Sequence, residues 1–416
     1  MLARNRIYQM DCLEGMRELG DASCDCCVTD PPYGIRFMGR KWDYEIPGFD
    51  VWKEVLRVLK PGAHLLCACG TRTHHRMAVN IEDAGFEIRD VICWHYGSGF
   101  PKSLDISKAM DKQAGPEREV IGVKTGKGGE NLNRISRDSA NDAYNAKGCG
   151  AFGKGARQID VALPVTTPAT DGAKKWEGWG TALKPATEFW TLARKPLEEK
   201  TIADNVLRYG TGGLNIDSCR IDAEDAKGGE YTVKRLKPGA TLTKTGGNWR
   251  LSEKDAILYQ GVMKAGRFPA NLIMDEFMAG EMDKQSGILT SGQPSGKRKA
   301  TNNVYGQYAP GQEITGYGDS GGASRFFYVA KADTAERGSG NNHPTVKPLT
   351  LMHYLLKLIC PIEPGRIVLE PFAGSGTTCL AARLLGVDFM AFELYEEHVR
   401  IAEGRLRREL GLFYDG

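Results

Sequence analysis

The stretch Asp30-Pro31-Pro32-Tyr33 combines residue types that can recognise an amino group carried by a flat ring. Asp30 accepts hydrogen bonds when ionised, and the two prolines lack an N–H, which leaves their surroundings rich in backbone carbonyl acceptors. Tyr33 offers a planar ring on which a base can stack. Acceptors beside a stacking face suit the exocyclic amino group of a heteroaromatic base. The alternative is a plain strand-ending turn, because Asp and Pro are also common turn residues.

A second candidate site is the run Glu370-Pro371-Phe372-Ala373-Gly374-Ser375-Gly376-Thr377-Thr378, which follows a short apolar segment. Its glycines let a ligand approach the backbone closely. Glu393, nineteen residues after Gly374, is near the spacing at which an acid accepts ribose hydroxyls in dinucleotide folds. The pattern G-x-G-x-x-G is absent, and Glu370 would repel a pyrophosphate but attract a cation. These features favour S-adenosyl-L-methionine, which carries adenosine and an ammonium group but no phosphate.

Both candidate sites follow predicted strands, Cys26–Val28 and Arg366–Leu369. Short strands alternate with helices in the first 95 residues and again after residue 348, which predicts an α/β fold with a mainly parallel, doubly wound sheet. Ligands bind at the carboxyl ends of the strands in such sheets. Apolar spacing predicts strands at 6–10, 64–69, 86–95, 188–194 and 389–392, and helices at 13–19, 49–59, 73–84, 349–359, 379–385 and 396–410. The strand at 188–194 is expected to form an antiparallel edge with 86–95.

Two long segments, 103–183 and 200–339, are rich in glycine and lack clear periodicity. Loops of this length are uncommon in a compact domain unless they are functional. Residues 231–250 contain no acid, and basic and aromatic side chains interleave there and in the following segment: Lys234, Arg235, Lys237, Lys244 and Arg250, with Tyr231, Trp249, Tyr305, Tyr308 and Tyr317. This pattern predicts contact with phosphates and bases; the alternative is a solvated surface insertion.

The composition of the 416 residues is that of a soluble globular protein, with 41% hydrophobic and 26% charged residues. The net charge of +3 means that nucleic-acid binding must rely on local patches. No secretory signal and no apolar run long enough for a membrane span is present, so a cytoplasmic protein is expected. Cys24 and Cys27 match a metal half-site in spacing, but buried thiols of a reducing compartment are the preferred interpretation, and no metal is expected.

The two candidate sites together resemble those of the amino-group DNA methyltransferases of the β class. In that class the Asp-Pro-Pro-Tyr block comes first, a target-recognition insert follows, and the cofactor block comes last. His343-Pro344-Thr345-Val346-Lys347-Pro348 and Asp11-Cys12 also resemble this class, and residues 97–103 and 184–196 resemble prophage-type members. The resemblance covers residues 1–102, 184–215 and 340–410.

The resemblance implies a circularly permuted, seven-stranded methyltransferase sheet with the last two strands at its centre and the N-terminal strand beyond them. The Asp30 strand would then neighbour the Leu369 strand. It also implies a domain division: 1–102 with 184–199 as the catalytic half, 103–183 as a first insert, 200–339 as the target-recognition insert, and 340–416 as the cofactor-binding half.

Site roles also follow from the resemblance. Glu370 would meet the ammonium of S-adenosyl-L-methionine, Glu393 the ribose and Asp11 the adenine amino group, with Thr345 and Lys347 near the carboxylate. The remaining cofactor-site residues would be Cys12, Pro371, Phe372, Ala373, Gly374, Ser375, Gly376, Thr377 and Thr378. A target base flipped out of double-stranded DNA would stack on Tyr33, while Asp30 and the carbonyl of Pro31 accept its amino hydrogens, with Pro32 completing the catalytic block. In the family, an aspartate at this position favours adenine N6 over cytosine N4.

Other functions fit parts of the sequence. Methylation of RNA or of a protein amide uses a similar block, but would not require the long basic and aromatic inserts. A DNA-binding protein with a vestigial cleft is disfavoured because Asp30, Tyr33, Glu370 and Glu393 are all present. A nicotinamide dehydrogenase is disfavoured by Glu370 and by the missing third glycine. The resemblance allows a homodimer, whereas the recognition sequence and any partner restriction endonuclease cannot be read from the chain.

Overall fold

The computed structural model describes residues 2–36, 43–99, 103–126, 161–223, 229–237, 243–245, 248–250, 256–290, 302–303, 306–307, 319–331 and 346–411. The chain divides into two compact units. The first contains residues 1–95, 188–332 and 347–416, and the second contains residues 96–187 and 333–346. Every candidate site residue in the described part of the chain belongs to the first unit.

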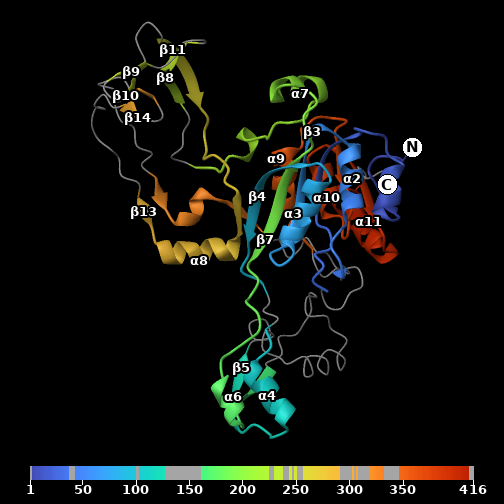
Figure 1. Ribbon diagram of the computed structural model, residues 1–416, viewed down its shortest axis with the longest axis vertical. Helices are drawn as coiled ribbons and strands as arrows, with labels where there is room; N and C mark the ends of the chain where they lie inside the picture. Colours follow the sequence, from blue (N-terminus) through green and yellow to red (C-terminus); the bar gives the residue numbers. More distant parts are fainter. Residues whose placement is uncertain are drawn as a thin grey trace. The chain divides into compact units, whose positions relative to one another are not determined.

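The first unit is built on a nine-stranded, mostly parallel sheet (Figure 1). Across the sheet the strands are β1 (Arg6–Gln9), β19 (Asp388–Glu393), β18 (Ile367–Glu370), β2 (Cys24–Thr29), β3 (Leu59–Gly70), β7 (Thr187–Arg194), β4 (Glu87–His95), β12 (Leu272–Asp275) and β17 (Tyr328–Ala330). The five strands from β1 to β3 are parallel, and β7 runs antiparallel to β3. The α/β fold class predicted from the sequence is confirmed.

Helices cover both faces of this sheet, which buries its central strands completely. All six residues of β2 are buried, as expected for a parallel strand between two helical layers. Cys26 and Val28 pack with α9 (Leu349–Ile359), α10 (Thr377–Leu384) and α11 (Glu396–Leu410). Cys24 and Cys27 pack on the other side with α1 (Cys12–Arg17), α2 (Phe49–Val58) and α3 (His74–Asp83). These cysteines are free thiols of the core.

Three expectations about the sheet are wrong. It has nine strands instead of seven, because β12 and β17 from the segment 200–339 extend it. Because these strands pair beyond β4, the neighbouring strands β7 and β4 do not form the edge of the sheet, although β7 does lie beside β4 as expected. The strands β18 and β19 lie near one edge and not at the centre, although β1 does pair beyond them and β18 does neighbour β2. The additional strands have only four and three residues, too few to show a period.

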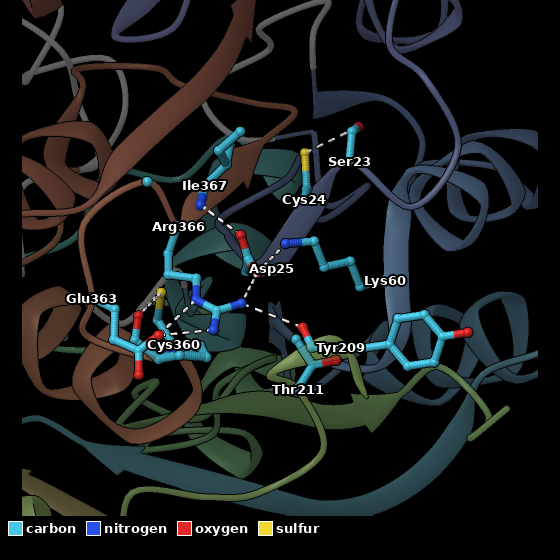
Figure 2. A network of polar contacts seen from close by, with 12 residues as sticks. Ser23, Cys24, Asp25, Lys60, Tyr209, Thr211, Cys360, Glu363, Arg366 and Ile367 are labelled. Atoms are coloured by element: carbon cyan, nitrogen blue, oxygen red, sulfur yellow. Dashed lines mark hydrogen bonds and ion pairs between the residues drawn. The ribbon is translucent and has the colours of Figure 1, made fainter. Parts of the chain in front are cut away.

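The amino ends of three adjacent strands are joined by one buried carboxylate, Asp25 of β2 (Figure 2). Its Oδ1 accepts hydrogen bonds from Lys60 Nζ at 2.6 Å and from Arg366 Nη1 at 3.0 Å. Its Oδ2 accepts one from the backbone N–H of Ile367 at 2.8 Å. Arg366 in turn pairs with Glu363 at 2.8 Å. The network therefore holds β2, β3 and β18 together at the end opposite Asp30.

Other elements of the first unit belong to the segment expected to be irregular. The helices are α7 (Ile202–Tyr209), η4 (Asp217–Cys219), α8 (Glu276–Ser286) and η6 (Ala323–Phe326). The strands form four antiparallel pairs: β8 (Gly229–Leu236) with β11 (Ala256–Met263), β9 (Thr243–Thr245) with β10 (Asn248–Arg250), β13 (Leu289–Thr290) with β16 (Ser320–Gly321), and β14 (Asn302–Asn303) with β15 (Gly306–Gln307). The basic segment 231–250 thus contains strands β9 and β10 and most of β8. Tyr305, Tyr308 and Tyr317 lie outside the described residues.

The second unit also contains regular structure where none was expected: α4 (Ile106–Ala114), α6 (Asp171–Lys175) and an antiparallel pair, β5 (Val120–Gly126) with β6 (Val161–Thr166). Asp111, which is 1% exposed, joins these elements. It pairs with Arg118 at 2.9 Å and accepts hydrogen bonds from the backbone of Ala169 and the hydroxyl of Thr170. Long-range contacts of this kind leave no periodic signal in a short helix.

Within the described residues, no helix combines the length and apolar character needed to cross a membrane.

Candidate active site

The two sequence blocks meet at the carboxyl edge of the sheet. Strand β2 lies beside β18, with Cys27 opposite Leu369, so the residues that follow each strand are neighbours. Thr29 donates a hydrogen bond from Oγ1 to Glu370 Oε1 at 2.5 Å, across 341 positions of sequence. Both side chains are buried. The Asp30 block and the glycine-rich turn are therefore parts of one site.

Glu370 is a buried carboxyl group surrounded by hydrogen-bond donors. Besides Thr29, the hydroxyl of Thr378 donates to it at 2.5 Å and the backbone N–H of Phe372 at 3.0 Å. Burial raises the pKa of Glu370 to about 8, against the lowering effect of these hydrogen bonds. A carboxyl group in this state ionises readily when a cation is brought to it, because the opposite charge offsets the cost of burial.

The turn after Glu370 packs tightly against α11. Gly374 and Gly376 have φ of +50° and +76°, values that favour glycine. A Cβ on Gly376 would lie 2.8 Å from the Cβ of Ala402, so this glycine is needed for helix packing as well. The hydroxyls of Ser375 and Thr377 accept hydrogen bonds from the buried Arg405 at 3.1 and 2.8 Å. These hydrogen bonds tie the turn to Arg405 of α11.

Glu393, at the end of β19, fixes the other side of the turn. Its Oε2 accepts a hydrogen bond from the backbone N–H of Gly374 at 2.8 Å, and its Oε1 accepts from the N–H of Tyr395 at 2.9 Å. His398 Nδ1 lies 3.3 Å from Oε1. Burial alone would raise the pKa of Glu393, but His398 and the backbone donors lower it overall. Glu393 is therefore an ionised carboxylate in the interior, the stronger hydrogen-bond acceptor for ribose hydroxyls.

Asp11 and Cys12 lie next to Glu393 because β1 pairs with β19, with Gln9 opposite Glu393. Asp11 caps α1 by accepting a hydrogen bond from the backbone N–H of Leu13 at 2.8 Å. Burial raises the pKa of the Cys12 thiol to about 12, so this cysteine remains a neutral apolar group. Asp11 is the polar residue of this pair that can face a ligand.

The Asp30 block forms a compact polar cluster with Lys347. Asp30 Oδ1 accepts a hydrogen bond from the hydroxyl of Tyr33 at 2.8 Å, and Oδ2 accepts one from Lys347 Nζ at 2.7 Å. The ammonium of Lys347 also lies 3.2 Å from Glu188 Oε1 and 5.4 Å from the centre of the Tyr33 ring. Burial lowers the pKa of Lys347, but Asp30 and Glu188 more than compensate, so the side chain is charged.

The backbone of the block is held by two further residues. Asp43, 1% exposed, accepts hydrogen bonds from the N–H groups of Tyr33 at 2.7 Å and Gly34 at 3.0 Å. Thr73 donates its hydroxyl hydrogen bond to the carbonyl of Tyr33 at 2.7 Å. Pro31 is buried and Pro32 is half-buried. The loop after β2 is therefore fixed on both sides of the tyrosine.

The structure brings together Asp30, Tyr33, Glu370 and Glu393, as the sequence predicted. Lys347 lies at Asp30, and its place near the carboxylate of the cofactor stays a prediction; Thr345 lies outside the described residues. The supporting residues Asp43, Thr73, Glu188 and Arg405 were missed. Of these, only Glu188 carries a local signal, since it is the one acid in a strand whose other residues, apart from the terminal Arg194, are apolar or threonine.

Comparisons with known proteins identify the family. A family model described as DNA methylase, for the N6 and N4 enzymes, matches residues 24–404. DNA adenine methyltransferase YhdJ of Escherichia coli is 40% identical over 65 residues, which are 16% of this chain and 21% of that protein. Type II methyltransferase M.HindIII of Haemophilus influenzae is 47% identical over 64 residues, 15% of this chain and 20% of that protein.

The similar curated proteins are matched over only part of their length, from 18% to 30%. Among solved structures, the cytosine-N4-specific PvuII DNA methyltransferase is 13% identical with a TM-score of 0.43, covering 100% of this chain and 93% of that one. The complex of M1.HpyAVI with S-adenosyl-L-methionine is 14% identical with a TM-score of 0.37, covering 96% of this chain and 98% of that one. Because the family model spans most of the sequence, the chain belongs to the N6/N4 DNA methylase family.

Proposed function

We propose that this chain is a site-specific DNA methyltransferase that transfers a methyl group from S-adenosyl-L-methionine to adenine N6 in double-stranded DNA after base flipping. The observation that carries the proposal is the hydrogen bond between Thr29 and Glu370 at 2.5 Å. It joins an amine-accepting block to a turn suited to a cationic adenosine cofactor, as methyl transfer to an amino group requires.

The residues around the turn suit S-adenosyl-L-methionine, the cofactor of this family. Glu370, with its raised pKa, is matched to the ammonium of the methionine moiety. Glu393 is an ionised acceptor for the ribose hydroxyls. Phe372, which is half-buried, offers an apolar wall, and Asp11 an acceptor for the adenine amino group. When bound, the cofactor supplies an electrophilic methyl group on a sulfonium.

Catalysis at the target base rests on acceptors of the chain itself. Asp30 and the carbonyl of Pro31 accept the two amino hydrogens, which concentrates the nitrogen lone pair toward the methyl group. Tyr33 stacks on the flipped base. No cysteine nucleophile is required, because the attacking atom is exocyclic; burial keeps the nearby Cys67 thiol neutral by raising its pKa well above the ordinary value. Positioning supplies most of the rate enhancement.

Adenine is favoured over cytosine because an aspartate stands at position 30. The local similarity to DNA adenine methyltransferase YhdJ supports the same choice. Cytosine N4 is the second candidate, since it also presents an amino group beside a ring nitrogen. The segment 231–250, with basic residues and no acid, is proposed to contact the DNA backbone, as part of a target-recognition insert spanning 200–339.

Modification-sensitive sequencing tests this function. The protein and its Asp30→Ala variant are expressed in cells that lack endogenous adenine and cytosine methylation, and the genomic DNA of both is sequenced. The expected result is N6-methyladenine at one short sequence motif with the wild-type protein and none with the variant. N4-methylcytosine would select the second candidate, and unmodified DNA with a folded, expressed protein would reject the proposal.

A further inference from the structure

Each carboxylate oxygen of Asp30 already accepts a hydrogen bond from another group of the protein. Tyr33 donates to Oδ1 at 2.8 Å and Lys347 donates to Oδ2 at 2.7 Å. The proposed function requires Asp30 to accept a hydrogen from the amino group of the target base. A carboxylate oxygen can accept a second hydrogen bond, so the target amino group either shares Asp30 with these donors or displaces one of them, and displacement is argued below for Lys347.

Lys347 is the donor that resembles the substrate, because it also presents N–H groups on a nitrogen to the same oxygen. Its position is enclosed: the residue is 8% exposed. An ammonium in such surroundings cannot simply lose its anionic partner, since an unpaired buried charge is strongly destabilising. A second anion must be within reach if Lys347 is to withdraw from Asp30.

Glu188 provides that second anion. It lies on β7, one strand beyond β3, and is 7% exposed. Its Oε1 is 3.2 Å from Lys347 Nζ, yet among the described residues this oxygen has no hydrogen-bond partner. A buried oxygen without such a partner is costly. The ammonium therefore donates to two groups, Asp30 Oδ2 and the Tyr33 hydroxyl at 3.2 Å, and has Glu188 beside it as a second anion with which it forms an ion pair but no hydrogen bond.

We propose that Lys347 occupies the position of the target amino group while the site is empty, and that Glu188 receives its ammonium when the base binds. Glu188 is then a positioning residue that acts through Lys347, and Asp30 remains the residue that contacts the substrate. The inference rests on the proposed DNA methyltransferase function. It assigns to Glu188 the control of access to Asp30.

A pH dependence follows from this arrangement. Burial raises the pKa of Glu188 to about 7, although Lys347 opposes the shift. The groups that face Glu188 are Lys347, Asp30, the Tyr33 hydroxyl and the Cys69 thiol. Burial raises the pKa values of Tyr33 and Cys69 well above this range, and Lys347 is charged. Protonation of Glu188 removes the second anion, so access of DNA should decrease as the pH falls through about 7.

The experiment compares Glu188→Gln, Glu188→Asp, Lys347→Met and the double variant Lys347→Met/Glu188→Gln with the wild-type protein. The rate of tritium transfer from labelled S-adenosyl-L-methionine to unmethylated genomic DNA is measured against DNA concentration and pH. Cofactor affinity is measured separately by calorimetry. Glu87→Gln is the matched control, because Glu87 of β4 pairs at 2.6 Å with Arg194 of β7, the strand that carries Glu188, but lies outside the site.

Glu188→Gln should lower kcat/KM for DNA about tenfold, leave cofactor affinity unchanged and remove the pH step near 7. Glu188→Asp should retain the step and part of the activity, and Glu87→Gln should behave as the wild type. In the Lys347→Met background, Glu188→Gln should have no further effect.

Equal losses in both backgrounds would overturn the inference. If Lys347→Met is inactive, equal losses in Glu188→Gln and Glu188→Asp, or a pH step that persists in Glu188→Gln, would overturn it. Absence of methyl transfer by the wild-type protein would instead reject the proposed function.

Discussion

An aspartate stands near each end of strand β2, the buried Asp25 in its second position and the half-buried Asp30 directly after it, and the two have very different partners. At the amino end, Asp25 has Lys60, Arg366 and the N–H of Ile367 as partners (Figure 2). At the carboxyl end, Asp30 shares Lys347 with Glu188, whose Oε1 has no hydrogen bond in the described part of the chain. The first cluster has its charges matched by fixed partners, and the second has an ammonium between two competing acids.

The difference separates a structural cluster from a functional one. Fully partnered charges fix strand positions and have no reason to rearrange. The Asp30 cluster instead contains a carboxyl group whose pKa is raised by burial to about 7, with Glu370 nearby at about 8. Perturbed pKa values of this kind gather at sites that bind and transform ligands. Variants at the two ends of β2 should therefore affect different properties.

The largest expected effect is the loss of methyl transfer in Asp30→Ala. Removing the acceptor for the target amino group should lower the rate by about a thousandfold, while the affinity for S-adenosyl-L-methionine changes little because Asp30 does not contact the cofactor in this account. Single-turnover transfer to DNA and calorimetric cofactor titration measure the two properties. Near-normal methyl transfer by Asp30→Ala would show that Asp30 is not the catalytic acceptor and that the two ends of β2 do not differ in function.

Asp25→Asn should have the opposite profile. Breaking a buried charge network is expected to lower the free energy of unfolding by about 3 kcal/mol, since Lys60 and Arg366 lose their shared anion. Activity of the folded fraction at low temperature should be retained. Chemical denaturation and the methyl-transfer assay test this pair of outcomes, and a stable but inactive variant would contradict the structural role.

Glu393→Ala should weaken cofactor binding by about thirtyfold, the value of a charged hydrogen bond to the ribose. The alanine also removes the acceptor for the N–H of Gly374, so the thermal stability of the variant must be measured alongside. Glu397→Ala on the exposed side of α11 is a suitable control. An unchanged cofactor affinity in Glu393→Ala would count against the ribose role.

The smallest effect concerns pH and Glu370. Its pKa is raised from 4.5 to about 8 in the folded state, so the folded protein binds more protons than the unfolded chain between these values. The contribution of Glu370 to the free energy of unfolding should therefore be fully present below pH 4.5 and should be lost as the pH rises toward 8. Between pH 6 and 7.5 the loss should be about 2 kcal/mol. Denaturation of the wild type and of Glu370→Gln at both pH values measures this. An identical slope in the variant would assign the dependence to other groups.

The sequence predicts the site to the extent that the site depends on strand ends. Asp30, Glu370 and Glu393 each follow a short apolar strand, and parallel strands bring their carboxyl ends to one edge. The helix bounds Leu349–Ile359 and Glu396–Leu410 are confirmed, because apolar periodicity is strong there.

Other features depend on contacts that no local pattern records. Glu188 of β7 pairs with Lys347, which lies far away in the sequence, and Arg405 of α11 contacts the glycine-rich turn. Strands β12 and β17 are too short to show a period. The contact of Lys347 with Asp30 is hidden in the same way, because a family motif gives the order of Lys347 in the chain but not its nearest charge. These residues become visible only when the strands are placed side by side.

Analysis of digested nucleosides tests the central claim most directly. Unmethylated DNA is incubated with the purified protein and methyl-labelled S-adenosyl-L-methionine, digested to nucleosides and separated by chromatography with mass detection. The account predicts labelled N6-methyldeoxyadenosine from the wild-type protein and none from Asp30→Ala. Label on a nucleoside other than N6-methyldeoxyadenosine, or equal label from the wild type and Asp30→Ala, would contradict the account. In that account Asp30 accepts a hydrogen bond from the adenine amino group next to the glycine-rich turn that binds the cofactor.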